Sequence, residues 1–173
     1  ACSQVMPDEK GPSAVAALQA AVAYYASLGV AVSRVMTDNG ACYKSHVFRD
    51  ACAELGLKHI RLIAPTTPAD RVELLAKASE GFIYALSRTG VTGAHGAPSA
   101  NIAETVARIQ QYTDVPVCVG FGISTPEQAA MVAASADGVI VGSAIVKQVE
   151  LNPENPAKAV RDFTEPLIRA VKS

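Results

Sequence analysis

The stretch Ser87-Arg88-Thr89-Gly90-Val91-Thr92-Gly93-Ala94 directly follows the apolar run 82–86, which predicts a β-strand. Its two glycines allow the backbone to turn tightly and a ligand to approach it closely. Two later apolar runs, at 115–119 and 138–141, also end in small residues just before a predicted helix. Three such ends on neighbouring parallel strands would together build one anion site.

Short strands and helices alternate outward from this stretch in both directions. Strands are predicted at 30–36, 59–64, 82–86, 115–119 and 138–141, with a weak signal at 2–6; helices are predicted at 14–28, 45–55, 68–79, 101–112, from 126 onward, at 143–150 and at 156–172. The alternation, with about six strands and short connections, is typical of βαβ units in a parallel sheet. The fold class is therefore α/β.

Helix-capping residues are predicted from the residue types at four of these boundaries. Ser13 is expected to cap the first helix, and Thr67 to cap a helix whose first residue is Pro68. Ser124 or Thr125 is expected to cap the helix from 126, with Glu127 or Gln128 completing a capping box. A glycine, Gly29, is expected to end the first helix in a left-handed conformation.

The composition bounds the function. The chain has 173 residues, half of them apolar, and a formal net charge of -1, which gives no electrostatic basis for binding nucleic acid. No apolar run is long enough to span a membrane, and no signal peptide is expected. The four cysteines form no C-x-x-C pair and no zinc spacing with histidine, so we expect reduced structural thiols, a cytoplasmic location, no metal and no cofactor.

The second part of the chain, residues 62–173, resembles the C-terminal half of the tryptophan synthase alpha subunit. The motifs that carry the resemblance are Ala64-Pro65-Thr66-Thr67-Pro68, Gly81-Phe82-Ile83-Tyr84, the stretch from Ser87 to Gly93, Gly120-Phe121-Gly122-Ile123-Ser124-Thr125-Pro126-Glu127-Gln128-Ala129-Ala130 and Ala136-Asp137-Gly138-Val139-Ile140-Val141-Gly142-Ser143-Ala144-Ile145-Val146. The resemblance implies half of an eight-stranded (β/α) barrel and an enzyme that cleaves indole-3-glycerol phosphate. It also implies that the substrate phosphate is held by Thr92, Gly93, Gly120, Gly122, Gly142 and Ser143.

The first part, residues 1–61, resembles a fragment of the integrase catalytic core of insertion-sequence transposases. The residues that carry this resemblance are Asp8-Glu9-Lys10-Gly11-Pro12-Ser13-Ala14, Tyr24-Tyr25-Ala26-Ser27-Leu28-Gly29-Val30, Arg34-Val35-Met36-Thr37-Asp38-Asn39-Gly40 and the segment from Ser45 to Arg61. It implies a ribonuclease-H-like βαβ fragment in which Asp38 matches one of three metal-binding acids. Together the two resemblances predict a chimera that forms one structural body, with an open sheet or an incomplete barrel.

The catalytic residues that the two resemblances imply are mostly not recognisable in this sequence. The acid and base of the alpha-subunit family come from the missing front half of the barrel, so no catalytic residue is predicted. Asp8, Glu9, Asp38 and Asp50 are interpreted as solvated turn residues, because nothing in the sequence directs them toward the retained loops. Asp38 is also the only acid in its motif, and a single carboxylate makes a poor magnesium site. The histidines His46, His59 and His95, which are well separated in the sequence, are interpreted as surface or packing residues.

Three functions remain open at this point. The first is a catalytically incomplete tryptophan synthase alpha-like fragment that binds phosphate or a phosphorylated small molecule of the glycerol phosphate type. The second is an active lyase completed by assembly, and the third is a recombinant fold-chimera with no selected activity. Because an incomplete barrel leaves strand edges unpaired, a homo-oligomer is expected.

Overall fold

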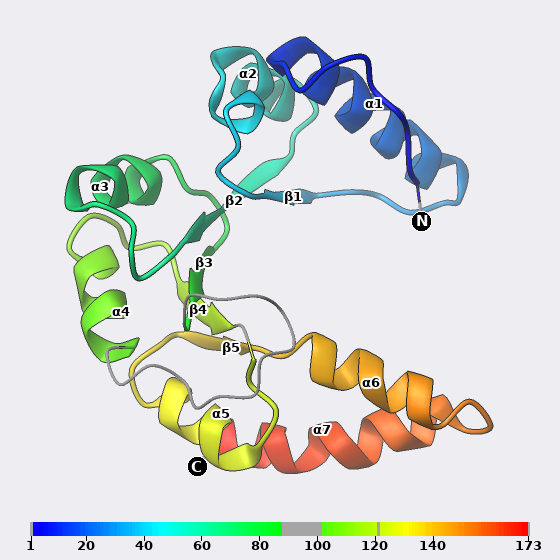
Figure 1. Cartoon of the computed structure of the whole chain (residues 1–173), viewed down its shortest axis with the longest axis vertical. Coiled ribbons are helices and arrows are strands. Elements are labelled where there is room, and N and C mark those ends of the chain that lie inside the picture. The colour runs from blue at the N-terminus through cyan, green and yellow to red at the C-terminus, as the bar shows by residue number, and fades with distance from the viewer. Residues whose placement is uncertain (1, 88–101, 121, 173) are drawn as a thin grey trace. The chain divides into compact units, whose positions relative to one another are not determined.

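The computed structural model describes residues 2–87, 102–120 and 122–172, and these divide into two compact units. The first unit holds residues 1–62 together with 79–81, and the second holds residues 63–78 and 82–173. Figure 1 shows helices and strands alternating within each unit. Each unit has its own core of buried apolar side chains.

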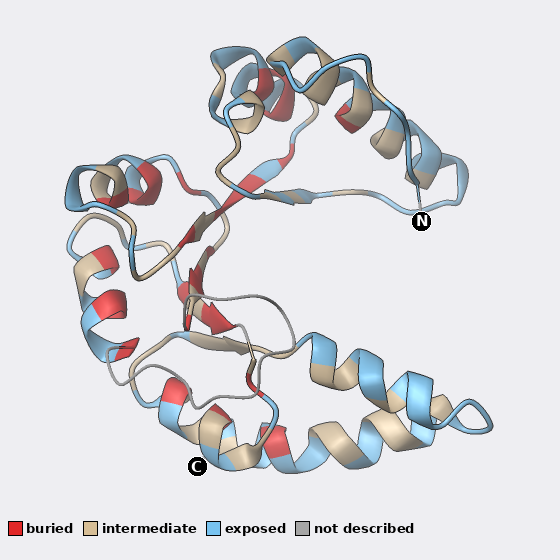
Figure 2. Ribbon diagram, viewed as in Figure 1, coloured by how far each residue is buried: buried red, intermediate tan, exposed pale blue. Residues whose placement is uncertain are grey.

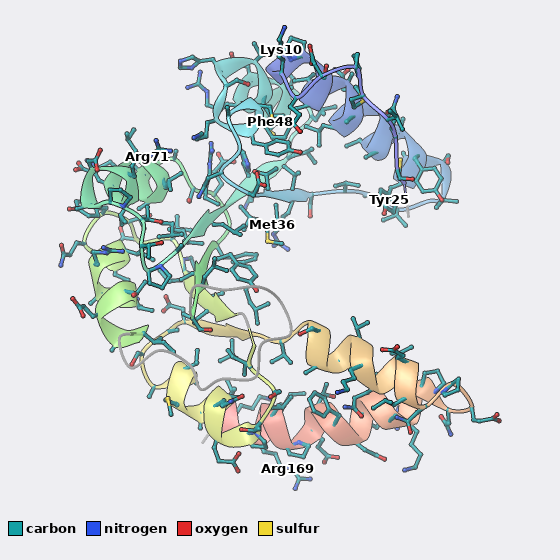
Figure 3. All side chains as sticks on the ribbon, viewed as in Figure 1. Lys10, Tyr25, Met36, Phe48, Arg71 and Arg169 are labelled. Atoms are coloured by element: carbon teal, nitrogen blue, oxygen red, sulfur yellow. The ribbon has the colours of Figure 1, made fainter. Side chains whose placement is uncertain are left out.

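The first unit is built on two parallel strands. Its elements are α1 (Gly11–Ser27), β1 (Arg34–Thr37), the 3-10 helix η1 (Cys42–Lys44), α2 (His46–Glu54) and β2 (Lys58–Ile63), whose last residue belongs to the second unit. Strand β1 pairs with β2 so that Arg34 lies opposite Lys58 and Thr37 opposite Arg61. The core gathers Leu18, Phe48, Cys52 and Leu57, and Figure 3 labels Phe48 on α2.

The second unit is a three-stranded parallel sheet with helices packed on one face. Its elements are α3 (Ala69–Lys77), β3 (Ile83–Leu86), α4 (Ile102–Gln110), β4 (Val117–Gly120), α5 (Pro126–Ala133), β5 (Gly138–Ile140), α6 (Ser143–Leu151) and α7 (Pro156–Lys172). Strand β4 is the central strand, paired with β3 on one side and β5 on the other. Figure 2 shows buried residues on β3 and β4 and on the helix faces turned toward the core, while the residues of β5 are only partly buried.

Side chains along β3 and β4 alternate between the two faces of the sheet, and one of these faces is buried against the helices. Ile83, Ala85, Val117 and Val119 are at most 1% exposed and pack in one cluster with helical side chains such as Val106. Tyr84, Leu86 and Cys118 are less buried and, by the period of two along a strand, point to the other face. The predicted α/β class with a parallel sheet is therefore confirmed, with five strands among the described residues rather than about six.

Two of the predicted helix caps, Ser13 and Thr67, are wrong, because each hydroxyl forms a hydrogen bond outside the helix start. The first helix begins at Gly11, with Pro12 in its first turn, and the Ser13 hydroxyl donates to Asp8 Oδ1 at 2.5 Å. Helix α3 begins at Ala69 with Pro68 as its N-cap, because Thr67 Oγ1 accepts instead from the Ala64 amide at 3.0 Å.

Other boundaries agree with the prediction or correct it. The Thr125 hydroxyl and the Gln128 side chain form the predicted capping box at α5, and Gly29 is left-handed at φ 74° after α1. The weak strand at 2–6 is wrong, because these residues form no strand and Val5 is 98% exposed. No helix in the described ranges is long and apolar enough to cross a membrane.

The histidine of β2 is a packing residue, as predicted. His59 is 4% exposed, its ring lies edge-on to Phe48 with centroids 5.4 Å apart, and its Nε2 lies 2.8 Å from Thr37 Oγ1. Burial, and to a smaller degree the nearby Arg61 charge, lower the pKa of His59 to about 4.

This lowered pKa predicts that acid destabilises the first unit. Between pH 6.5 and 4 the unfolded chain binds a proton at His59 that the folded chain does not, so the stabilisation is complete above pH 6.5 and is lost as the pH falls toward 4. We expect the free energy of unfolding to fall by roughly 3 kcal/mol over that range through this group. Denaturant titrations at several pH values measure it, with His59→Gln, which keeps a polar partner for Thr37, as the non-titrating control. An equal pH slope in the wild type and the variant would contradict the assignment.

Candidate functional site

The C-terminal ends of three strands meet at one edge of the sheet in the second unit. In the parallel register Leu86 lies opposite Gly120, and Gly120 opposite Ile140. The Ser87 amide, just past β3, donates to the Gly120 carbonyl at 2.8 Å. The segments that follow β3, β4 and β5 therefore all leave from the same edge, where ligands of open α/β sheets bind.

Gly122 lies where the chain leaves β4 for α5. Its φ is +82°, a conformation that side chains with a Cβ rarely adopt. The next residue, Ile123, is 2% exposed in the core, and the Ser124 amide donates to Gln128 Oε1 at 2.9 Å. Because the core and the capping box hold the residues after it, the left-handed turn at Gly122 is anchored at the edge.

Two residues separate the end of β5 from the start of α6. Gly142 is its N-cap and offers no side-chain acceptor, while its carbonyl accepts from the amides of Ile145 and Val146 at 2.9 and 3.1 Å. A Cβ built on Gly142 would meet no atom within 4 Å. The amides of the first turn, beginning with Ser143, therefore present the positive end of the helix dipole on an open side.

Packing explains why position 120 is a glycine. A Cβ at this position would lie 2.6 Å from the Tyr84 hydroxyl oxygen and 2.9 Å from Ile140 Cβ. The family resemblance implies that Gly120 holds phosphate, but the space beside Gly120 is filled by the hydroxyl end of the Tyr84 ring. Burial raises the pKa of Tyr84, so its hydroxyl stays protonated at neutral pH.

Tyr84 is the residue at this edge that the sequence analysis missed. The available signal was its place on β3, between Ile83 and Ala85, which are both fully buried on the opposite face. A large aromatic residue at that position must turn away from the helices, and the neighbouring strand must leave room for it.

Two of the six predicted phosphate residues, Thr92 and Gly93, lie outside the described residues, as does His95. The other four, Gly120, Gly122, Gly142 and Ser143, lie at or next to the ends of β4 and β5. The described part of the chain contains no group of three or more histidine, cysteine, aspartate or glutamate side chains arranged to hold a metal ion.

The four acidic residues considered in the sequence analysis belong to the first unit. Three of them, Asp8, Asp38 and Asp50, have a local bonding partner. Asp38 Oδ1 accepts from the Gly40 amide at 2.8 Å, as predicted for a turn residue. Asp50 pairs with the adjacent Arg49 at 2.9 Å. A hydrogen bond from Ser13 lowers the pKa of Asp8, which makes that carboxylate a weaker base than usual.

The contact between Tyr84 and Gly120 can be tested by a double-mutant cycle. Gly120→Ala is expected to destabilise the protein by about 1–3 kcal/mol, because the new methyl group overlaps the Tyr84 ring. In the background Tyr84→Leu, which withdraws the hydroxyl and the ring end, the same change should cost at least about 1 kcal/mol less. Chemical denaturation of the four proteins gives the coupling energy, and strict additivity would show that the two residues do not compete for this space.

Comparison with known proteins places this chain in a family. A sequence profile described as tryptophan synthase alpha chain matches residues 35–172. The alpha chain from Picosynechococcus sp. is 45% identical over 130 residues, which are 74% of this chain and 49% of that protein. The alpha chain from Geobacter sulfurreducens is 54% identical over 101 residues, or 58% of this chain and 38% of that one.

The fold agrees with solved structures over a longer range. A structure of tryptophan synthase from M. tuberculosis superimposes with a TM-score of 0.73 at 33% identity, covering 90% of this chain and 57% of that chain. The fold is thus that of these TIM-barrel-like relatives, while the chain spans about half the length of the curated relatives it matches.

These comparisons bear on the interpretation of the first 61 residues. They give no support to a transposase fragment, a ribonuclease-H-like segment or a chimera joined near residue 62. The family match begins at residue 35 and so includes 35–61, which the sequence analysis had assigned to the foreign piece. The chain belongs to the tryptophan synthase alpha chain family.

Proposed function

We propose that the chain is a catalytically incomplete tryptophan synthase alpha-like protein that binds a phosphorylated small molecule of the glycerol phosphate type. The observation that carries the proposal is the N-terminus of α6, which is open and has no side-chain cap, at the same sheet edge as the left-handed turn at Gly122. Backbone amides at a helix N-terminus and the helix dipole together favour an anion. We also propose a cytoplasmic location, to which the four free cysteines are suited.

The roles within the site follow from the backbone. Ser143 and the next amide of α6 would donate to phosphate oxygens, and Gly122 would let the loop after β4 approach the same anion. Thr92 and Gly93 would complete the site from the segment after β3. Gly120 would act indirectly, by giving Tyr84 room at the edge.

Incomplete catalysis is proposed because a base and an acid must act on one substrate. The chain spans about half of its relatives, and Asp8, Asp38 and Asp50 already have local partners. Indole release from indole-3-glycerol phosphate measures the remaining activity. We expect none above the uncatalysed rate, and turnover would favour the alternative of a lyase completed by assembly.

Substitutions at Gly142 test the anion site without crowding the fold. An aspartate there has room, can accept from the first-turn amides and places a negative charge where phosphate would bind. We expect Gly142→Asp to weaken phosphate and glycerol 3-phosphate binding at least about tenfold, since 1.4 kcal/mol of repulsion suffices for that factor. Amide chemical shifts of Gly122 and Ser143 report the binding.

Gly142→Asn is the matched control, because it caps the helix with a side chain of the same size but no charge. It should weaken binding less than Gly142→Asp. Equal binding by the wild type and Gly142→Asp, or no phosphate response at Gly122 and Ser143 in the wild type, would contradict the site.

We further propose that the chain is a homo-oligomer through the surface of α6 and α7. A cavity of about 450 Å³ there is lined mainly by apolar residues, among them Val139, Ile145, Ile168 and Val171. Ile168 is 52% exposed and Val146 is 66% exposed, and exposed apolar patches mark association surfaces. A complex with a second kind of subunit is the alternative, because the relatives are named alpha chains.

Light scattering over a wide concentration range tests this surface. Ile168→Glu is expected to shift the protein toward the monomer, because a charge buried against an apolar partner is costly. The control is Leu74→Glu on α3, at a residue that is 65% exposed and does not line the cavity. A monodisperse wild-type monomer would contradict self-association.

A further inference from the structure

Arg61, on β2 of the first unit, is a buried cation outside the site proposed above. It is 7% exposed and shares its strand face with His59, which is 4% exposed. Strands β1 and β2 carry three permanent cations, Arg34, Lys58 and Arg61, and no acidic residue. A buried guanidinium is normally paired with an anion, because its charge loses hydration on burial.

The surroundings of Arg61 leave this charge without a bonded partner. None of the five ion pairs among the described residues includes Arg61, and its Nε is fully shielded from solvent without a hydrogen-bond partner. Burial lowers the pKa of Arg61, and the field of Arg49 lowers it further. Arg49 itself binds Asp50, with contacts of 2.9 and 3.1 Å, so that carboxylate is already engaged.

Two other groups near Arg61 can carry a negative charge. The Cys52 thiol is one, but burial raises its pKa and keeps it neutral at pH 7. Glu80 is the other, an exposed carboxylate that favours the Arg61 charge without forming an ion pair within 4.0 Å in the described structure. A carboxylate that remains in water compensates a buried charge only weakly.

We propose that Arg61 is the anchor of a second anion site, which takes a small oxyanion such as inorganic phosphate or a phosphate monoester. The guanidinium fork donates two parallel hydrogen bonds to two oxygens of such an anion. Arg49 adds positive charge to the site, and Glu80 is the competing carboxylate that sets its affinity. This site lies in the first unit and requires none of the residues of the strand edge in the second unit.

The test is an NMR titration of the whole ¹⁵N-labelled chain with inorganic phosphate, and separately with glycerol 3-phosphate, at constant ionic strength. We expect a saturable shift of the Arg61 Nε–H signal and of the Cys52 and Glu80 amides. Saturation with both probes assigns a site open to monoesters, and saturation with inorganic phosphate alone assigns a site for the free ion. Gly122 and Ser143 report the other site in the same spectra, so failure at one is separable from failure at the other.

Three variants sharpen the result. Arg61→Met, which replaces the cation by an apolar chain of similar length, should remove the Cys52 and Glu80 responses and leave those at Gly122 and Ser143 unchanged. Glu80→Gln should tighten binding several-fold by removing the competing charge. Arg71→Gln, at an arginine in the second unit, should change nothing at the Arg61 site.

The proposal is overturned if Arg61 Nε–H follows ionic strength alone, or if Cys52 and Glu80 respond equally in Arg61→Met. It is also overturned if Glu80→Gln shifts Arg61 Nε–H strongly without phosphate and abolishes the titration, because Glu80 would then be the bonded partner. If Arg61→Met does not fold, Arg61→Lys replaces it, and a roughly tenfold weaker response is expected because lysine lacks the fork.

Discussion

The parallel register of β3, β4 and β5 is the constraint on which the second unit depends. Leu86, Gly120 and Ile140 lie side by side in that register, so three chain segments leave the sheet at one edge. The register is held by side-chain alternation, since Ile83, Ala85, Val117 and Val119 must all face the helices. A shift by one residue would turn these four side chains away from the core.

The three glycines at this edge have different structural roles. Gly120 makes room for the Tyr84 ring, Gly122 supplies a left-handed turn, and Gly142 leaves the start of α6 open. In the proposed site, only Gly122 and Gly142 would bear directly on an anion. The edge is thus a packed structure in which an aromatic residue and a glycine are matched, with the amides of α6 exposed beside it.

Local chemistry was predictable from the sequence, and tertiary packing was not. The Thr125 and Gln128 capping box and the stop at Gly29 need only residues close in sequence, and both were predicted. Thr67 was misassigned because its hydroxyl accepts from Ala64 rather than from the helix. The match of Tyr84 with Gly120 depends on strand register, which no single segment encodes.

The same distinction applies to the larger assignments. The motifs between 62 and 150 led to the correct family, whereas residues 35–61 carry a different local pattern, Thr37-Asp38-Asn39-Gly40, and were assigned elsewhere. In the structure that pattern is a turn after β1, with Asp38 accepting from Gly40 and the Asn39 amide donating to the Leu62 carbonyl at 2.7 Å. A turn motif of this kind specifies a strand end, which many α/β folds share.

We propose that the sheet edge in the second unit binds an anion through backbone amides. A structure determined from crystals grown with phosphate or sulfate is the sharpest test. We expect a tetrahedral anion within hydrogen-bonding distance of the Ser143 amide and next to Gly122. A first turn of α6 that is occupied by water or by a protein side chain, in crystals that hold the anion elsewhere, would contradict it.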